Sequence, residues 1–166
     1  MKKENKKRNG FTLIELLAVI VILAVLITMA MPSVLQLMTK AQTNAFKTEA
    51  QSYINAAETA YADARITSSS AIKQLTISGN FYSYYCITIT DLNSKYISKD
   101  NTDYKGYVQV FVPTAGGNPT YYIQLDNGTY KVTSLSTKLN DGTAAIVAGS
   151  AATYACPTTY PTALPS

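Results

Sequence analysis

The residues of this chain that could do chemistry lie near its N-terminus. Glu15 stands inside an otherwise apolar run, at the fifth position after Gly10. The leader before Gly10 is basic, with Lys2, Lys3, Lys6, Lys7 and Arg8. A charged side chain in the middle of a membrane helix is unfavourable by about 2.5–3.5 kcal/mol even on the scale derived from insertion experiments. A carboxylate at this position therefore indicates a partner of opposite charge and a role for that pair.

The rest of the sequence holds little that could form an active site. It has no His, which removes the usual base for a Ser or Cys nucleophile and most transition-metal sites. Residues 100–103 (Asp-Asn-Thr-Asp) lack the spacing and the distal Glu of a calcium loop, so we interpret them as a solvated turn. No glycine-rich phosphate loop is present. We predict no enzyme activity, no cofactor and no metal.

The two cysteines, Cys86 and Cys156, lie 70 positions apart, which is not the spacing of a metal site. The basic leader argues for export, and two cysteines in an exported domain most often form a disulfide. We expect that pairing. The alternative is two buried, unpaired thiols.

The positive charge of the chain is concentrated in its leader. Residues 1–10 contain five of the 14 basic residues and one of the ten acidic ones, so the remainder holds nine of each sign. A basic segment ahead of an apolar one orients a membrane helix with that end in the cytoplasm. The neutral remainder, rich in Tyr and Thr, suits a protein that packs against copies of itself better than one that binds phosphate.

Three interpretations compete for the apolar run. Residues 11–32 would form a helix about 33 Å long, enough to cross a bilayer core of about 30 Å. A secretory signal peptide is disfavoured because the run is too long, contains Glu15 and offers only Thr28-Met29-Ala30 as a cleavage site. A plain membrane anchor explains the length but neither Gly10 nor Glu15. A class III leader, cut between Gly10 and Phe11 with the helix retained, explains all three.

On these residues the chain resembles the type IV pilins and pseudopilins. The resemblance covers roughly residues 1–60 and rests on Gly10-Phe11-Thr12-Leu13-Ile14-Glu15-Leu16, the apolar residues that follow, and Pro32. It implies that prepilin peptidase cuts after Gly10 and methylates the new amine of Phe11. It also implies that the helix hydrogen bonds before Pro32, over Ala24 to Met31, open in an assembled filament, since proline has no N–H to donate.

The resemblance also gives Glu15 an assembly role, as the acceptor of the Phe11 ammonium of a neighbouring subunit. A carboxylate and an ammonium are both unfavourable alone in hydrocarbon, and pairing relieves both. The alternative is a pair between Glu15 and the Phe11 amine of the same chain, four residues earlier on one helical face. The first pair would form on assembly and the second before it.

The remaining pattern predicts an α+β fold of the pilin type. Apolar residues at steps of three and four predict that the helix continues to about Ile66, with one line of Val34, Met38, Ala41 and Ala45, and another of Phe46, Ala50, Tyr53, Ala57, Ala60 and Ala64. So long a helix would leave its apolar half outside the globular domain. Strands are expected over 81–89, 107–112, 121–125 and 130–132, with a helical turn near Asp91–Ser94 and a tight turn at Asp126-Asn127-Gly128. We predict a three- or four-stranded antiparallel sheet packed on the helix.

These expectations divide the chain into a cleaved leader (1–10), a transmembrane and filament-core helix (11–32), an amphipathic helical half (33–70) and a globular domain with a C-terminal tail (71–166). The tail would be tied to the first strand through Cys86 and Cys156.

The function that the resemblance implies is that of a structural subunit. We expect a pilin, the major subunit rather than a minor one, that waits in the cytoplasmic membrane and polymerises into an extracellular type IV pilus for adhesion, twitching motility or biofilm formation. Its partners would be other copies of itself, minor pilins, prepilin peptidase and the membrane platform of the pilus machine; a host surface or DNA stays open as a ligand. The alternatives are a pseudopilin of a secretion or DNA-uptake system and a membrane-tethered binding domain that never polymerises.

Overall fold

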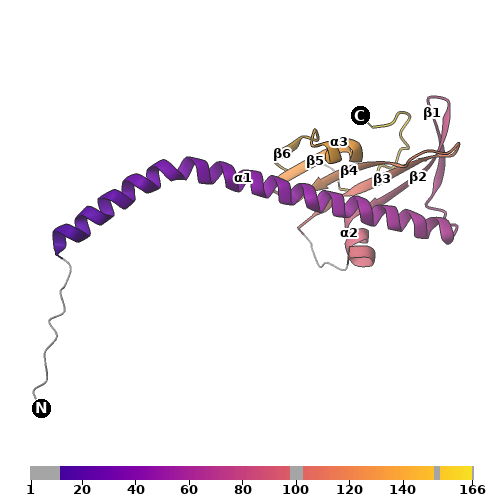
Figure 1. Ribbon diagram of the computed structural model, residues 1–166. Helices are drawn as coiled ribbons and strands as arrows, with labels where there is room; N and C mark the ends of the chain where they lie inside the picture. Colours follow the sequence, from indigo (N-terminus) through magenta and orange to yellow (C-terminus); the bar gives the residue numbers. More distant parts are fainter. Residues whose placement is uncertain (1–11, 98–102, 152–153, 166) are drawn as a thin grey trace, which may run out of the picture. The chain divides into compact units, whose positions relative to one another are not determined.

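The computed structural model describes residues 12–97, 103–151 and 154–165 of the chain. Its first element is one helix, α1 (Leu13–Ile66), followed by an antiparallel sheet (Figure 1). The helix ends where the sequence predicts, just before Thr67 to Ser70, which have little helix propensity. The chain divides into two compact units, Met1–Gln42 and Thr43–Ser166, so that α1 contributes to both.

The second unit is built around the C-terminal part of α1. The predicted apolar line of this part is confirmed, because all six of its residues are buried: Phe46, Ala50, Tyr53, Ala57, Ala60 and Ala64. Four of the six are alanines, whose small side chains let a sheet approach the helix closely. The other predicted line, from Val34 to Ala45, stays exposed in the single chain.

The sheet has six strands in the order of the sequence, and every neighbouring pair is antiparallel. The strands are β1 (Lys73–Ile77), β2 (Asn80–Thr88), β3 (Lys105–Pro113), β4 (Thr120–Asp126), β5 (Tyr130–Leu135) and β6 (Ile146–Ala148). The α+β architecture of a long helix packed on an antiparallel sheet is therefore confirmed. The four strands that we expected are β2 to β5, and the expected count was too low by the two edge strands.

The edge strands escaped prediction because they bury little. Only Ile77 of β1 is fully buried, and none of the three residues of β6 is. An edge strand has one free side and needs no continuous apolar signal in its sequence. The four central strands carry that signal because they form the core.

The two faces of the sheet are covered by different segments. One face packs on α1 through residues such as Ile87, Val108 and Ile123. The opposite face holds a smaller cluster of Ile77, Tyr84 and Phe111. The C-terminal tail reaches this second face, because Cys156 forms a disulfide with Cys86 and the ring of Tyr160 lies 5.9 Å from that of Tyr84.

Short helical segments connect the strands. The turn expected near Asp91 is present as α2 (Ile89–Leu92) and the π-helical η1 (Asn93–Ile97), but its N-cap is Thr88, three residues before Asp91. Helix α3 (Ser136–Asp141) ends at Gly142, whose φ of 85° closes the helix in the left-handed conformation.

The tight turn between β4 and β5 is confirmed. The Asn127 carboxamide oxygen accepts from the backbone N–H groups of Thr129 (3.0 Å) and Tyr130 (2.7 Å), and Gly128 has a φ of 82°. This is the turn chemistry for which Asn and Gly are favoured.

Candidate functional site

The start of α1 is closed by a reciprocal pair of side chains, Thr12 and Glu15. The Glu15 Oε2 atom accepts from the Thr12 backbone N–H (2.8 Å) and from the Thr12 hydroxyl (2.7 Å), while the Glu15 N–H donates to Thr12 Oγ1 (3.3 Å). This arrangement is a capping box, in which a Thr and a Glu three residues later satisfy each other's backbone groups. This role of Glu15 was not predicted, although the Thr-x-x-Glu spacing is visible in the sequence.

The capping box leaves the second oxygen of Glu15 available. Oε1 accepts no hydrogen bond from the residues that the structure describes. Gly10 and Phe11 lie outside the described residues, so their cleavage and methylation, and both pairs between Glu15 and a Phe11 amine, stay predictions. The carboxylate can hold its own helix end with one oxygen and present the other to a cation.

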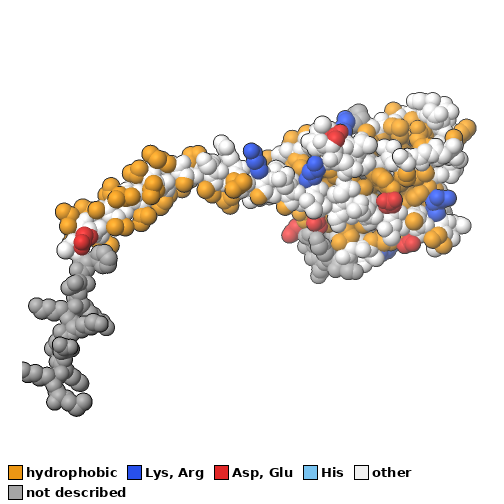
Figure 2. All heavy atoms as spheres, in the orientation of Figure 1, with side chains coloured by type: hydrophobic (Ala, Val, Ile, Leu, Met, Phe, Trp, Pro, Cys, Tyr) orange, Lys and Arg blue, Asp and Glu red, His pale blue; other side chains and the backbone are white. Residues whose placement is uncertain are grey.

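The helix that follows Glu15 is apolar and uncovered in the single chain. Its large side chains from Leu13 to Met38 are all at least 49% exposed, and Figure 2 shows hydrophobic side chains along this stretch. The one polar interruption, Thr28, donates its hydroxyl to the carbonyl of Val25 at 2.8 Å, so it adds no unsatisfied donor. Among the described residues, α1 is long and apolar enough to cross a membrane, judged by length and composition.

Pro32 lies inside α1, which is helical on both sides of it. Proline donates no hydrogen bond to the carbonyl four residues earlier, here that of Thr28. The opening of the helix before Pro32 was expected of the assembled filament and stays a prediction.

Residues 5–31 match the model of the prokaryotic N-terminal methylation motif. The chain carries the class III prepilin leader of type IV pilin-like proteins. The match includes Gly10, Phe11 and Glu15 and ends one residue before Pro32. No curated protein and no solved structure matches the chain.

The prepilin leader indicates the precursor of a pilin-like or pseudopilin subunit. It implies processing by prepilin peptidase and assembly into pilus-like polymers, and the apolar helix after it is consistent with anchoring in a membrane before assembly. The family is one of structural subunits. Within the described part of the chain, no three His, Cys, Asp or Glu side chains lie together in a way that could hold a metal ion.

Proposed function

We propose that this protein is the major subunit of a type IV pilus. The observation that carries the proposal is the prepilin leader followed by a long, exposed apolar helix with a single carboxylate near its start. Such a helix in water would be strongly unfavourable, because each Å² of apolar surface left exposed forfeits about 25 cal/mol. It needs either lipid or other copies of itself around it.

The two coverings correspond to two stages. The precursor waits in the cytoplasmic membrane with its basic N-terminus in the cytoplasm, and prepilin peptidase cuts it between Gly10 and Phe11 and methylates the Phe11 amine. On assembly, the helix leaves the lipid and enters a bundle of neighbouring helices. Glu15 then accepts the Phe11 ammonium of a neighbour, and this pair sets the depth at which the new subunit stops.

The architecture of the sheet domain supports the proposal of a major structural subunit. Its six strands pair in sequence order, so that each strand lies beside the next and no separate inserted domain interrupts the described sheet. After the leader the chain carries nine basic and nine acidic residues, which allows copies to pack without net repulsion. Adhesion, twitching motility and biofilm formation are the roles that such a filament would serve.

The decisive experiment is to shear the cells and to determine the intact mass and N-terminal sequence of the dominant released protein. The proposal expects a protein that begins at methylated Phe11. A Gly10→Leu variant should stay uncut in the membrane, whereas Asn9→Leu, which places the same side chain one residue earlier, should be processed.

Two other outcomes would contradict the proposal. Processed protein that stays in the membrane while shearing releases none would favour a pseudopilin or a minor subunit. Normal processing of Gly10→Leu would contradict the cleavage position.

A further inference from the structure

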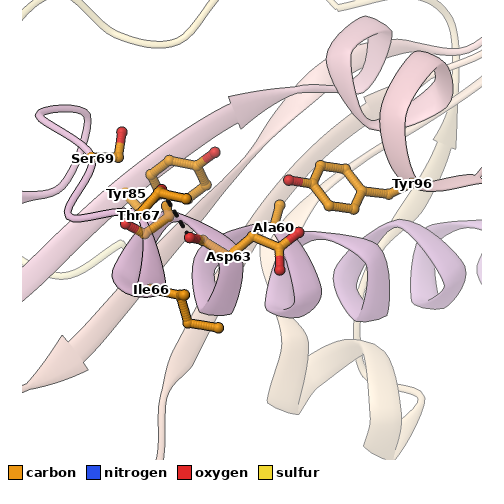
Figure 3. Close-up of a pocket in the computed structure, with 8 residues that line it drawn as sticks. Ala60, Asp63, Ile66, Thr67, Ser69, Tyr85 and Tyr96 are labelled. Atoms are coloured by element: carbon orange, nitrogen blue, oxygen red, sulfur yellow. Dashed lines mark hydrogen bonds between the residues drawn. The ribbon is translucent and has the colours of Figure 1, made fainter.

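A polar groove lies beside the C-terminal end of α1, in the second unit. It encloses about 390 Å³ and is lined by α1 residues including Ala60, Asp63 and Ala64, and by Tyr85 of β2 and Tyr96 of η1. Figure 3 shows the Tyr96 ring pointing from η1 toward the helix at Ala60 and Asp63. We refer to it as the tyrosine groove. The two alanines leave room above the helix. The functional groups that line the groove are one carboxylate, two phenols and the hydroxyls of Thr67 and Ser69.

The Asp63 carboxylate has an unfavourable electrostatic position. It lies in the last turn of a long helix, where the backbone dipole is negative and favours cations rather than anions. The Asp63 carbonyl is itself engaged, since it accepts from the Thr67 N–H (3.0 Å) and the Thr67 hydroxyl (2.9 Å). Among the described residues no Lys or Arg forms an ion pair with Asp63.

Both phenols of the groove have raised pKa values, and burial is the main cause. Burial, the charge of Asp63 and a hydrogen bond to its carboxylate raise the pKa of the Tyr96 hydroxyl. Burial, followed by the charges of neighbouring groups that include Asp91 and Asp63, also raises the pKa of Tyr85. Both phenols therefore stay neutral at physiological pH, and their rings keep the electron-rich faces that attract cations.

We propose that the tyrosine groove binds an organic cation of the alkylammonium or guanidinium class, such as an extended Lys or Arg side chain. The cationic head would pair with Asp63 and lie against the faces of Tyr85 and Tyr96, and the methylene stem would lie over Ala60 and Ala64. With Asp63 as the one carboxylate among the residues that line it, the groove makes a poor site for a divalent metal ion such as calcium, which takes six or more oxygen ligands.

The cation has two candidate sources, a neighbouring copy of this chain and a free alkylammonium compound. A neighbouring copy is the source that the proposed function favours, and this part of the inference rests on it. After the leader the chain has one Arg, Arg65, and eight Lys, so a lysine is the natural occupant. Binding of the cation itself does not depend on filament formation.

The first test uses the full processed chain in maltoside micelles, which carry no ammonium headgroup. The chain is labelled with 3-fluorotyrosine, the resonances of Tyr85 and Tyr96 are assigned with their Phe variants, and butylammonium is titrated against butanol as the uncharged control. We expect saturable shifts at both tyrosines with butylammonium and none with butanol. Asp63→Asn should weaken binding about tenfold or more, the loss expected for one charge-assisted hydrogen bond.

The matched control is Glu58→Gln, which removes the same charge from an exposed position of the same helix. It should leave binding unchanged, and both variants should keep the wild-type melting temperature within a few degrees. The inference would be overturned by equal shifts with butanol, by undiminished binding to Asp63→Asn, or by no saturable shift at either tyrosine.

The second test distinguishes the sources. Carbodiimide joins a carboxylate to an amine in contact with it, with loss of water, and mass spectrometry then identifies the joined peptides. The filaments are sheared from the cell surface and contain both ¹⁴N and ¹⁵N copies of the chain. A neighbouring copy is the source of the cation if Asp63 becomes joined to a lysine in these filaments but not in micelles. Butylammonium binding without this bond supports a free cation instead. A chain that yields no filaments contradicts the proposed function, and the micelle titration still decides the inference.

Discussion

Glu15 has to close the start of its own helix and, in the proposed filament, also to pair with the ammonium of another chain. In the described structure one of its oxygens is engaged by Thr12, and the other accepts nothing from the described residues. The capping box therefore holds the carboxylate in place with half of its hydrogen-bonding capacity. Glu15 can therefore cap its helix and pair with the Phe11 ammonium of a neighbour at the same time. Variants can test the two roles separately.

Substitution of Glu15 by Gln should lower the yield of filaments without disturbing the helix end. Gln closes a capping box as Glu does, so the variant should be cut and methylated normally, while the missing charge should lower the yield of sheared filaments about tenfold or more. Thr12→Ala is the complementary variant, because it removes a cap worth about 0.5–2 kcal/mol and keeps the charge. Filaments from Glu15→Gln, together with none from Thr12→Ala, would show that assembly needs the cap and not the charge.

Two buried tyrosines should make the domain sensitive to alkali. Burial raises the pKa of Tyr53 and of Tyr121 to about 12, and the Tyr53 hydroxyl donates to Asn93 Oδ1 at 2.9 Å. An unfolded tyrosine ionises near pH 10, so the unfolded state loses these protons first as the pH rises. Stability should be complete below about pH 10 and should fall progressively toward about pH 12, by on the order of 2 kcal/mol for each tyrosine.

This fall can be followed by circular dichroism melts and by tyrosinate absorbance between pH 8 and pH 12. Tyr53→Phe should be less stable at pH 7, because it leaves the Asn93 carbonyl without this donor, but its further loss in alkali should be smaller than that of the wild type. An equal alkaline loss in both proteins would contradict the assignment to Tyr53.

At the scale of elements, α1 is one helix with two environments. Its N-terminal part is apolar on every side and exposed, whereas its C-terminal part is amphipathic and buries one line of residues against the sheet. Among the described residues, the large apolar side chains of the first part are exposed, whereas the second part contributes buried residues to the core. In the proposed function, lipid or other copies of the chain cover this first part.

The pairing of β3 with β4 depends on one glycine. Gly106 has a φ of 134°, and a Cβ atom there would lie 1.9 Å from the backbone oxygen of Gln124. Since that oxygen belongs to the neighbouring strand, the sheet would have to deform. Gly106→Ala should lower the free energy of unfolding by about 4 kcal/mol or more.

Gly117 provides a matched control, because it has the same φ of 134° but a Cβ atom there would lie 3.6 Å from Pro113 Cγ, which is ordinary contact. Gly117→Ala should therefore show only the backbone strain, about 1–2 kcal/mol. Thermal melts monitored by the near-ultraviolet tyrosine signal compare the two variants. Similar losses would mean that strain, and not the clash with β4, determines the effect.

At the scale of the whole molecule, the C-terminal tail is held to the sheet by contacts rather than by regular structure. The disulfide joins it to β2, the Lys131 ammonium donates to the Ser150 carbonyl at 3.1 Å, and the Ala151 N–H donates to the buried carboxylate of Asp126. The described residues after Ala148 contain no helix and no strand. We therefore expect the tail to loosen before the core unfolds once the disulfide is removed.

Removal of the disulfide by Cys86→Ser with Cys156→Ser should destabilise the domain and loosen the tail. In the chain-entropy model, a loop of this length contributes about 4 kcal/mol. We expect a lower melting temperature and early proteolytic cuts confined to residues 149–165, identified by mass spectrometry. Reduction of the wild type should reproduce both effects. A double variant that melts and resists proteolysis like the oxidised wild type would show that the other contacts suffice.

Features that are local or periodic could be predicted from the amino-acid sequence. The order of Gly10, Phe11 and Glu15 marks the prepilin leader, the apolar period marks the helix to Ile66, and alternation marks the four central strands. The Thr12–Glu15 box belongs to the same class, since its three-residue spacing can be seen in the sequence, although it was not predicted. Each of these signals lies within a short stretch of chain and is imposed by backbone geometry.

Only the tertiary structure decided which distant residues meet. The edge strands β1 and β6 exist because they pair with strands that the core already holds, and their own sequences carry little signal. The tyrosine groove joins Asp63, Tyr85 and Tyr96 from three separate elements. The position of the tail on the second face of the sheet likewise depends on long-range packing. Such contacts are set by how whole elements pack, so no local pattern of residue types could have revealed them.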